Sequence, residues 1–494
     1  MTALFVTRLS SLERPLFLGK ERRELPAGAF AIADRAGFAD GVPFILNDDG
    51  SYDRSLNRFF IECRSMGLRS PNSLKAYARD ILTWMRFLIE WRGKTIWSAD
   101  GQDLIAYHRA RRQGPASRRI SAASWNRSIA ALEKFYCWAA EEELISLTPF
   151  AYRRVWHHRP GVRRAVLAPV NSAYEPAARR HDMRFIDLDR FLQFRDIGLR
   201  GRLPDGTEDP DWRGRNGERN ALFAELLVTT GMRISEAAYW LTHDLPSVDA
   251  KVENGVRTMP FTLPAAITKG AKRRDVRLPV RVLRQLQDYV GLERANAAVQ
   301  FTSGEALRRC SDWLYIRRRD GQRLQIARDD DAPQWVALHQ LSPSERHRLL
   351  DGAGGGPPSA PAALWLTEGG APMPVGAWAA VFRRASRRCR DFGVDLDVTP
   401  HMLRHAYAVH MLSLLIRAQI GFVLESRRDV HGAVYKRTIG DPLQKLQRLL
   451  GHASIMSTYV YLDSLEESRA LVEAAASQMA MDISDAAQQM EAAP

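Results

Sequence analysis

Arginine, histidine, lysine and tyrosine side chains recur in four short segments of the sequence, and together these residue types suit phosphoryl transfer. A guanidinium is always charged, and its forked N–H donors match two oxygens of one phosphate. A tyrosine phenol attacks a phosphodiester well only when a base takes its proton, cations hold the developing negative charge and an acid protonates the leaving oxygen. The four segments contain residue types for each task.

The first segment places an arginine between two predicted helices. An apolar helical pattern over residues 221–229 ends at Gly231, and a new helix begins with Arg233. An arginine held in this way is well suited to bind a phosphate. Pairing between Arg233 and Glu236 is the structural alternative if this segment is considered alone.

The second segment combines a histidine and an arginine at a predicted helix start. Thr399 is a plausible N-cap and Pro400 a first-turn residue, so His401 and Arg404 form an i, i+3 pair near backbone N–H groups that favour anions. A metal site built from His401 and His405 lacks the glutamate and the third ligand that such sites use. We therefore expect His405 to be a hydrogen-bonded helix histidine.

The third segment is a polar turn, Lys269 to Lys272, between predicted strands at residues 257–263 and 274–278. Either lysine could reach a bound anion from the tip of this hairpin.

The fourth segment follows a predicted helix that ends at Gly451. His452 stands at the helix exit, and Tyr459 and Tyr461 follow a short helix later. A lone tyrosine is more often a packing residue than a nucleophile. This segment therefore indicates a catalytic role only in combination with the other three segments.

Composition favours a nucleic-acid partner. The 494 residues carry a formal net charge of +14 and a pI near 9.8, which suits an anionic partner. The four cysteines are scattered singly, which excludes a disulfide framework and a cysteine-based zinc site. The sequence has neither a signal-peptide pattern nor an apolar run long enough to cross a bilayer, so we expect a cytoplasmic protein that does not bind membranes.

Periodicity and composition divide the chain into five parts. Residues 1–50 are expected to form an N-terminal extension without sustained strand or helix periodicity, and residues 51–150 a compact helical domain. Residues 151–180 form a basic linker, and residues 181–465 a mainly helical α+β domain that contains a flexible, apolar-poor loop at 352–361. Residues 466–494 are expected to form a tail helix.

Arginines without nearby acids mark a candidate phosphate-binding surface in the helical domain and the linker. A solvated charged face is the alternative, although such faces usually mix signs. The candidate DNA-binding residues are Arg109, Arg111, Arg112, Arg118, Arg119, Arg127, Arg153, Arg154, Arg163 and Arg164.

The order and spelling of TTGMRISE, TKGAKRRDVRLP, TPHMLRHAYAVHML and LLGHASIMSTYVY resemble the tyrosine site-specific recombinases, or phage integrase family, over about residues 50–465. The resemblance implies a fold that is mainly α with a small β-hairpin or sheet. It further implies a helical core-binding domain, at 51–150, and a catalytic domain that together close on duplex DNA as a C-shaped clamp.

The resemblance also implies roles for individual residues. Arg233 and Arg404 would clamp the scissile phosphate, and Lys269 would protonate the 5′-hydroxyl leaving group. His401 would accept or donate a proton, and His452 would hydrogen-bond the phosphate. No cofactor and no metal are implied.

Tyr461 is the expected nucleophile, because the family's tyrosine stands nine positions after the histidine of the LGH motif, which is His452 here. By the same comparison Tyr459 is interpreted as a packing residue, Lys269 is favoured over Lys272 by the TKG spelling, and Glu236 is interpreted as structural. The sequence departs from compact members at 198–217, between Lys269 and His401, and at an insert around 413–438.

The expected function is site-specific cutting and rejoining of duplex DNA through a 3′-phosphotyrosyl link by a homotetramer, for integration, excision or transposition of a mobile element. A partnership with other recombinase subunits is a further expectation. The alternatives are a type IB topoisomerase-like relaxase and a catalytically silent or partner-dependent accessory DNA-binding protein. A metal-dependent nuclease lacks the acidic cluster that it needs.

Overall fold

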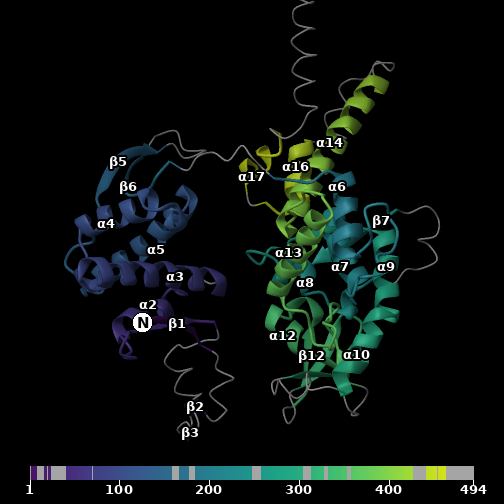
Figure 1. Ribbon diagram of the computed structural model, residues 1–494, viewed down its shortest axis with the longest axis horizontal. Helices are drawn as coiled ribbons and strands as arrows, with labels where there is room; N and C mark the ends of the chain where they lie inside the picture. Colours follow the sequence, from purple (N-terminus) through teal and green to yellow (C-terminus); the bar gives the residue numbers. More distant parts are fainter. Residues whose placement is uncertain are drawn as a thin grey trace, which may run out of the picture. The chain divides into compact units, whose positions relative to one another are not determined.

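The chain forms two compact units, Met1–Arg179 and Arg180–Pro494, called unit 1 and unit 2 below (Figure 1). The structure is a computed structural model, and each unit is described by itself. The residues described are 2–7, 16–18, 21–23, 41–68, 70–157, 166–176, 184–246, 257–303, 313–327, 332–352, 358–426, 441–452 and 454–462.

Helices make up most of unit 1, and capping side chains fix where they start. Asp53, Asp100 and Ser121 each accept a hydrogen bond from a backbone N–H in the first turn of the following helix. The helical segment that begins at Pro71 ends at Gly93, which has a φ of 61°. The helices are α2 (Arg54–Glu62), α3 (Pro71–Phe87), η2 (Leu88–Arg92), η3 (Ile96–Ser98), α4 (Gly101–His108), η4 (Arg109–Gln113), η5 (Ala116–Arg118) and α5 (Ala122–Glu141).

Aromatic side chains fill the core of unit 1. Trp84, Trp125, Phe135 and Tyr136 are almost completely buried. The Tyr136 hydroxyl accepts a hydrogen bond from Trp84 Nε1 at 2.8 Å and donates one to the Ile96 carbonyl at 2.8 Å, so this buried polar group is satisfied. The predicted helical domain therefore has its own core.

The N-terminal residues differ from the predicted extension, because part of them joins this core. Strand β1 (Ala3–Val6) pairs antiparallel with β4 (Pro43–Leu46). Ile45 is buried in the core, and its backbone N–H and carbonyl both bond to the Asn57 side chain, at 2.7 and 2.9 Å. Short strands such as these carry too few residues to show a period. A second short pair is β2 (Leu16–Leu18) with β3 (Glu21–Arg23).

The segment expected to be a basic linker, 151–180, contains a hairpin. Strand β5 (Tyr152–His157) pairs antiparallel with β6 (Val166–Asn171) along its whole length. Arg153 and Arg154 are compatible with this hairpin because their side chains are exposed, so the strand can pair without burying their charges. Residues 158–165 lie outside the described residues.

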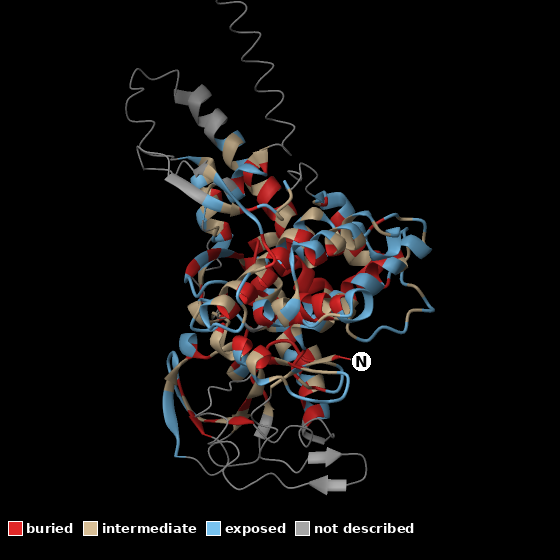
Figure 2. Ribbon diagram, turned by 90° about the vertical axis from the view of Figure 1, so that its left-hand side faces the viewer, coloured by how far each residue is buried: buried red, intermediate tan, exposed pale blue. Residues whose placement is uncertain are grey.

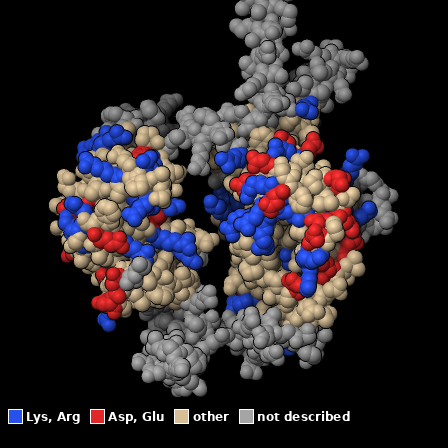
Figure 3. Space-filling view, viewed as in Figure 1, with Lys and Arg blue, Asp and Glu red and all other residues tan. Residues whose placement is uncertain are grey.

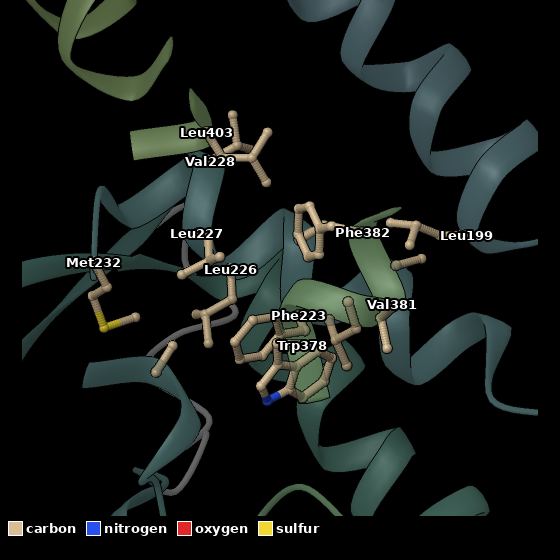
Figure 4. Close-up of a cluster of buried hydrophobic side chains, with 14 of the residues drawn as sticks. Leu199, Phe223, Leu226, Leu227, Val228, Met232, Trp378, Val381, Phe382 and Leu403 are labelled. Atoms are coloured by element: carbon tan, nitrogen blue, oxygen red, sulfur yellow. The ribbon is translucent and has the colours of Figure 1, made fainter. Parts of the chain in front are cut away.

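Unit 2 is built around buried helices. Trp378 on α13 (Val375–Asp391) stacks on Phe223 of α7 (Gly217–Thr230), with ring centroids 3.6 Å apart and an interplanar angle of 7° (Figure 4). Buried residues of the described chain gather in the interior, drawn red in Figure 2. The other helices are α6 (Leu188–Gln193), η6 (Phe194–Leu199), α8 (Ile234–Ala238), η7 (Thr242–Asp244), η9 (Ala265–Ile267), α9 (Val280–Gly291), α10 (Glu293–Ser303), η10 (Leu338–Gln340), α12 (Pro343–Arg348), α14 (Pro400–Ser426), α16 (Pro442–Leu450) and α17 (Met456–Tyr459).

The described residues of unit 2 also form two sheets. The predicted hairpin is confirmed as β7 (Thr258–Leu263) paired antiparallel with β8 (Arg274–Pro279). A five-stranded sheet in the order β11-β10-β9-β12-β13 occupies part of the expected extra segment between Lys269 and His401. Its strands are β9 (Leu314–Asp320), β10 (Arg323–Ala327), β11 (Gln334–Ala337), β12 (Leu349–Gly352) and β13 (Pro358–Pro361).

This sheet corrects the prediction of an unpacked loop at 352–361. Strand β13 pairs with β12, and the neighbouring Ala362 is fully buried, so the segment is packed at its far end. The buried Arg346 side chain joins the sheet region to the helical core through the carbonyls of Leu338 and Tyr239. The loop residues 353–357 lie outside the described residues.

The other predicted departures are described only in part. The 198–217 segment is anchored by Arg388, which bonds to Asp209 Oδ2 at 2.5 Å and lies 4.8 Å from the Trp212 ring centroid. Helix α14 runs through the start of the 413–438 insert, whereas residues 427–440 and the expected tail helix at 466–494 lie outside the described residues.

Candidate active site

The first arginine of the site is held by a buried carboxylate. Helix α7 ends at Gly231 (φ 64°), and Arg233 is the N-cap of α8. Glu236, fully buried, accepts hydrogen bonds from Arg233 Nη1 at 2.9 Å and from the Arg233 backbone N–H at 2.8 Å. The Arg233 side chain stays about one-quarter exposed, which leaves donors for a ligand.

A second arginine, which the sequence analysis did not select, shares the same carboxylate. Arg274 at the start of β8 lies 2.5 Å through Nη2 from Glu236 Oε2, and its Nη1 donates to the Leu449 carbonyl at the end of α16. Burial is the main cause that lowers the Arg274 pKa, and Glu236 acts in the opposite direction. Glu236 therefore joins the hairpin to α8.

Arg404 is the third guanidinium and the most buried of the three catalytic-site arginines, at 2% exposure. It lies in the first turns of α14, where the predicted cap is present because Thr399 Oγ1 accepts from Met402 N–H at 3.3 Å. Its Nη1 donates to the Gly231 carbonyl and its Nη2 to the Leu450 carbonyl at 2.5 Å. Burial, with Arg233 and Arg274 nearby, lowers the Arg404 pKa to about 9, so the group remains charged at neutral pH.

Two of the three guanidiniums, those of Arg233 and Arg274, bond to Glu236, whereas Arg404 bonds to backbone carbonyls, so three positive charges face one carboxylate and the cluster carries excess positive charge. Arg404 and Arg274 also take the last carbonyls of α16, which no helical N–H can satisfy. Because the cluster is partly desolvated, an anion with several oxygens is the ligand that neutralises its positive charge best.

His452 follows directly after α16. The helix ends at Gly451 (φ 64°), as predicted, and the His452 Nδ1 lies 3.0 Å from Thr458 Oγ1. Burial, followed by the charges of Arg404 and Arg233, lowers the His452 pKa to about 4, so the ring is neutral at pH 7. The His452 ring is nearly parallel to that of Tyr461, with centroids 6.1 Å apart.

The two tyrosines of the last segment differ in environment. Tyr461 is 2% exposed, and its hydroxyl lies 3.1 Å from His405 Nδ1. Burial raises the Tyr461 pKa, while Arg404 and Arg233 act to lower it. Tyr459 is 44% exposed, so its interpretation as a packing residue was wrong. The short α17 turns Tyr459 outward and Tyr461 toward α14 and α16.

The two histidines of α14 lie against each other. The rings of His401 and His405 are 4.2 Å apart at 67°. Burial is the main cause that lowers both pKa values, to about 4 for His405, and Arg404 acts on both in the same direction. His405 is a hydrogen-bonded helix histidine, as expected, but its partner is the Tyr461 hydroxyl.

The lysine turn lines a pocket of about 880 Å³ next to this cluster. Thr268 closes the turn, because its Oγ1 donates to the Lys272 carbonyl at 2.8 Å. Lys269 and Lys272 are both exposed and both line the pocket, so the choice between them stays a prediction. The charged lining residues are Arg233, Lys269, Lys272, Arg273, Arg274, Asp275, Arg277, Lys445 and Arg448. Figure 3 shows Lys and Arg grouped on part of the surface of unit 2.

Comparison with protein families decides the relationship. The N-terminal SAM-like domain of phage integrases matches residues 56–143, and the phage integrase family matches residues 209–416. The chain belongs to the phage integrase family of tyrosine recombinases. It is a site-specific recombinase, an enzyme class that cleaves and rejoins DNA. The second match covers Arg233, Lys269, His401 and Arg404 and ends before His452 and Tyr461.

Curated relatives of this recombinase carry the same description. Tyrosine recombinase XerD of Ralstonia nicotianae is 22% identical over 79% of this chain and 83% of its own length. Tyrosine recombinase XerC of Rhodospirillum centenum is 25% identical over 80% and 78%. XerD of Corynebacterium glutamicum is 32% identical over a shorter stretch, which covers 21% of this chain and 27% of that protein.

Solved structures are similar at low identity. The XerH recombinase bound to its difH substrate in a post-cleavage complex is 13% identical, with 86% of this chain and 85% of that chain covered and a TM-score of 0.44. A lambda integrase dimer bound to a COC′ core site is 14% identical, with 82% and 93% covered and a TM-score of 0.39.

The candidate DNA-binding arginines of the recombinase divide into two kinds. Arg112 lies 2.7 Å from the Glu175 carboxylate, and Arg127 lies 3.0 Å from Asp80, so these two are already paired. The sequence analysis did not predict these two pairings, because both acids stand far from their arginines in the chain. Arg112 and Arg127 are themselves partly exposed and exposed, respectively, so pairing with an acid, and not burial, sets them apart. The other described candidates are also exposed or partly exposed, namely Arg109, Arg111, Arg118, Arg119, Arg153 and Arg154, whereas Arg163 and Arg164 lie outside the described residues.

Two further observations concern the described part of the recombinase. Its helices include none long and apolar enough to span a membrane. Its histidines, cysteines and acids include no group of three or more placed to hold a metal ion.

Proposed function

We propose that Tyr461 is the nucleophile of this recombinase and that it forms a 3′-phosphotyrosyl link with duplex DNA. Its phenolic oxygen bonds to the scissile phosphorus, the P–O5′ bond breaks, and the freed 5′-oxygen takes up a proton. A 5′-hydroxyl of a second duplex then attacks the same phosphorus and releases the tyrosine. The energy of the phosphodiester is kept in the tyrosyl ester, so no high-energy cofactor is consumed.

The observation that carries this proposal is the arginine cluster beside Tyr461. Arg233 and Arg404 supply the clamp on the two non-bridging oxygens, because their charge exceeds what Glu236 can neutralise. Hydrogen-bond donors that are already fixed in place stabilise the negative charge of the pentacoordinate transition state, because they need not move when that charge develops. Geometry connects Tyr461 to the cluster, because its ring centroid lies 6.1 Å from that of His452, which follows the end of α16 that Arg404 bonds.

Proton transfer is assigned to the residues around the clamp. Lys269 gives its proton to the leaving 5′-oxygen, with Lys272 as the alternative donor in the same turn. The low pKa of His401 makes its ring neutral and therefore able to accept the phenol proton of Tyr461. His452 hydrogen-bonds the phosphate, and its bond to Thr458 fixes the ring.

We also propose the assembly and the biological role. Units 1 and 2 close on DNA as a clamp, and four protomers act on two sites so that strands can be exchanged. The extra segments of unit 2 favour a mobile-element recombinase. The exposed arginines of unit 1 supply sequence-independent phosphate contacts.

A covalent-capture experiment tests the proposal. The protein is incubated with fragmented DNA from its source cell and denatured, and the DNA that stays attached is sequenced. One enriched sequence is expected. Arg404→Ala should reduce the attachment rate about 10²- to 10³-fold, as for other fixed donors of a transition state. Attachment at an equal rate would contradict the clamp.

A further inference from the structure

Arg274 links three parts of the site that are far apart in the sequence. Its Nη2 bonds to Glu236, its Nη1 bonds to Leu449 at the end of α16, and its own backbone begins β8. Only 9% of the residue is exposed, so it has little room to contact DNA. A side chain in this position holds other groups rather than the substrate.

Arg274 lies at the base of the loop that carries the lysine turn and bonds that base to the rest of the site. Leu263 and Arg274 are partners in the β7–β8 register, and the ten residues between them, 264–273, form the loop that carries Lys269. Gly270 and Ala271 at the tip have φ values of 79° and 52°. Lys269 and Lys272 are exposed, whereas Arg274 at the base of the loop is buried. Where the loop points therefore depends on how its base is fixed.

The fit around Arg274 is tight. A Cβ on Gly451 would lie 2.5 Å from Arg274 Cδ and 3.0 Å from Nε, so the helix end that precedes His452 rests directly on this side chain. On the other side, the carboxylate that it bonds is the one that holds Arg233. Arg233, the Lys269 loop and the His452 segment therefore share one buried support.

We infer that Arg274 is a positioning residue that delivers the leaving-group acid to the scissile phosphate held by Arg233. The inference rests on the proposed function, in which Lys269 protonates the 5′-oxygen. Lysine cannot replace Arg274, because a single ammonium group lacks the fork that reaches Glu236 and Leu449 together. The variant Arg274→Lys keeps the positive charge but loses the two-armed contact, so it distinguishes an effect of positioning from an effect of charge.

Replacement of the bridging 5′-oxygen by sulfur isolates this role. A thiol ionises near pH 8.5, so a 5′-thiolate leaves without an acid, whereas a 5′-alkoxide needs one. The cleavage rates of oxygen-linked and sulfur-linked DNA are compared for wild type and for Arg274→Lys, Lys269→Ala, Arg233→Lys and Arg277→Lys. Arg277 is the matched control, since it lies on the same strand and lines the same pocket but is exposed.

Loss of a general acid slows a reaction about 10²- to 10⁴-fold. Arg274→Lys and Lys269→Ala should lose about 100-fold or more on the oxygen linkage and return to within about tenfold of wild type on sulfur. Arg233→Lys should stay slow on both linkages, and any effect of Arg277→Lys should be equal on both. Gly451→Ala, which presses on Arg274 from the opposite side, should show the same sulfur rescue as Arg274→Lys.

The outcomes separate two failures. If sulfur rescues Lys269→Ala but neither Arg274→Lys nor Gly451→Ala, the positioning role is wrong and the acid assignment stands. If sulfur does not rescue Lys269→Ala, the acid assignment of the proposed function is wrong. Wild-type rates for Arg274→Lys on both linkages would also overturn the inference.

Discussion

At the scale of single residues, the buried Tyr461 lies next to His405 and His452, and His401 packs on His405. Burial and the neighbouring arginines lower the pKa values of His401, His405 and His452, the last two to about 4. The His405 contact at 3.1 Å orients the Tyr461 hydroxyl. Under the proposed function, a neutral histidine ring accepts the proton of the Tyr461 phenol.

These pKa shifts predict how stability depends on pH. An unfolded histidine takes up its proton near pH 6.5, whereas folded His405 and His452 do so only near pH 4. Between these values the unfolded chain binds more protons, so the free energy of unfolding falls as pH drops from about 6.5 to about 4. Denaturation of wild type and of His452→Gln at pH 7 and pH 5 measures this. The variant should lose less stability, and an equal loss would contradict the histidine assignment.

The sequence alone reveals the residues that carry local motifs but not those whose role depends on burial. Arg233, Arg404 and His452 stand at helix ends that Gly231, Thr399 and Gly451 mark in the sequence. Arg274 begins β8 directly after the exposed Arg273, and nothing in the local sequence distinguishes the two arginines. The two arginines differ only in their tertiary contacts, because the fold brings Glu236 and the end of α16 to Arg274.

At the scale of elements, the site depends on how α16 ends. Gly451 adopts φ 64°, a conformation that costs other residues about 1 kcal/mol or more, and a methyl group there would also strike Arg274. Gly451→Ala should therefore destabilise the protein by about 2–4 kcal/mol in chemical denaturation.

Gly270→Ala is the matched control for this prediction. Gly270 has φ 79° in the lysine turn, but no atom lies within 4 Å of an added methyl group. Gly270→Ala should lower the free energy of unfolding only through backbone strain, by about 1 kcal/mol. Equal losses for the two variants would show that the contact with Arg274 does not matter.

The helices and the β7–β8 hairpin were predictable because caps, glycines and periodicity are local signals. The five-stranded sheet was missed because two of its strands hide their pattern. Strand β9 carries Arg317, Arg318 and Arg319 in its second half, and β13 is Pro358–Pro361, with two prolines among its four residues. Strand β9 also pairs in parallel with β12, which follows β10 and β11 in the chain, and sequence periodicity does not reveal such a pair.

At the scale of the whole molecule, the net charge of +14 predicts salt-sensitive DNA binding. The logarithm of the binding constant should fall linearly with the logarithm of salt concentration, by about 0.9 for each phosphate neutralised. Arg118→Gln and Arg119→Gln should each reduce this slope by about 1. Arg112→Gln and Arg127→Gln should leave it unchanged, since Glu175 and Asp80 already pair with these side chains. Equal slopes for all four variants would contradict this division.

Domain boundaries were predictable from composition only approximately. The helical and catalytic parts correspond to separate units that divide at Arg179, close to the end of the predicted linker. The hairpin β5–β6 and the strand pair β1–β4 belong to unit 1, although β5 carries Arg153 and Arg154 and β1 and β4 have only four residues each. Backbone pairing and contacts with a distant core decide such segments.

The most direct test of the central claim is the identity of the DNA-linked residue. DNA carrying the captured site is incubated with wild type, Tyr461→Phe and Tyr459→Phe, and the covalent product is digested and mapped by mass spectrometry. The account predicts attachment on Tyr461 in wild type and in Tyr459→Phe, and none in Tyr461→Phe, which should still bind DNA. Attachment that persists in Tyr461→Phe, or that maps to Tyr459, would contradict it.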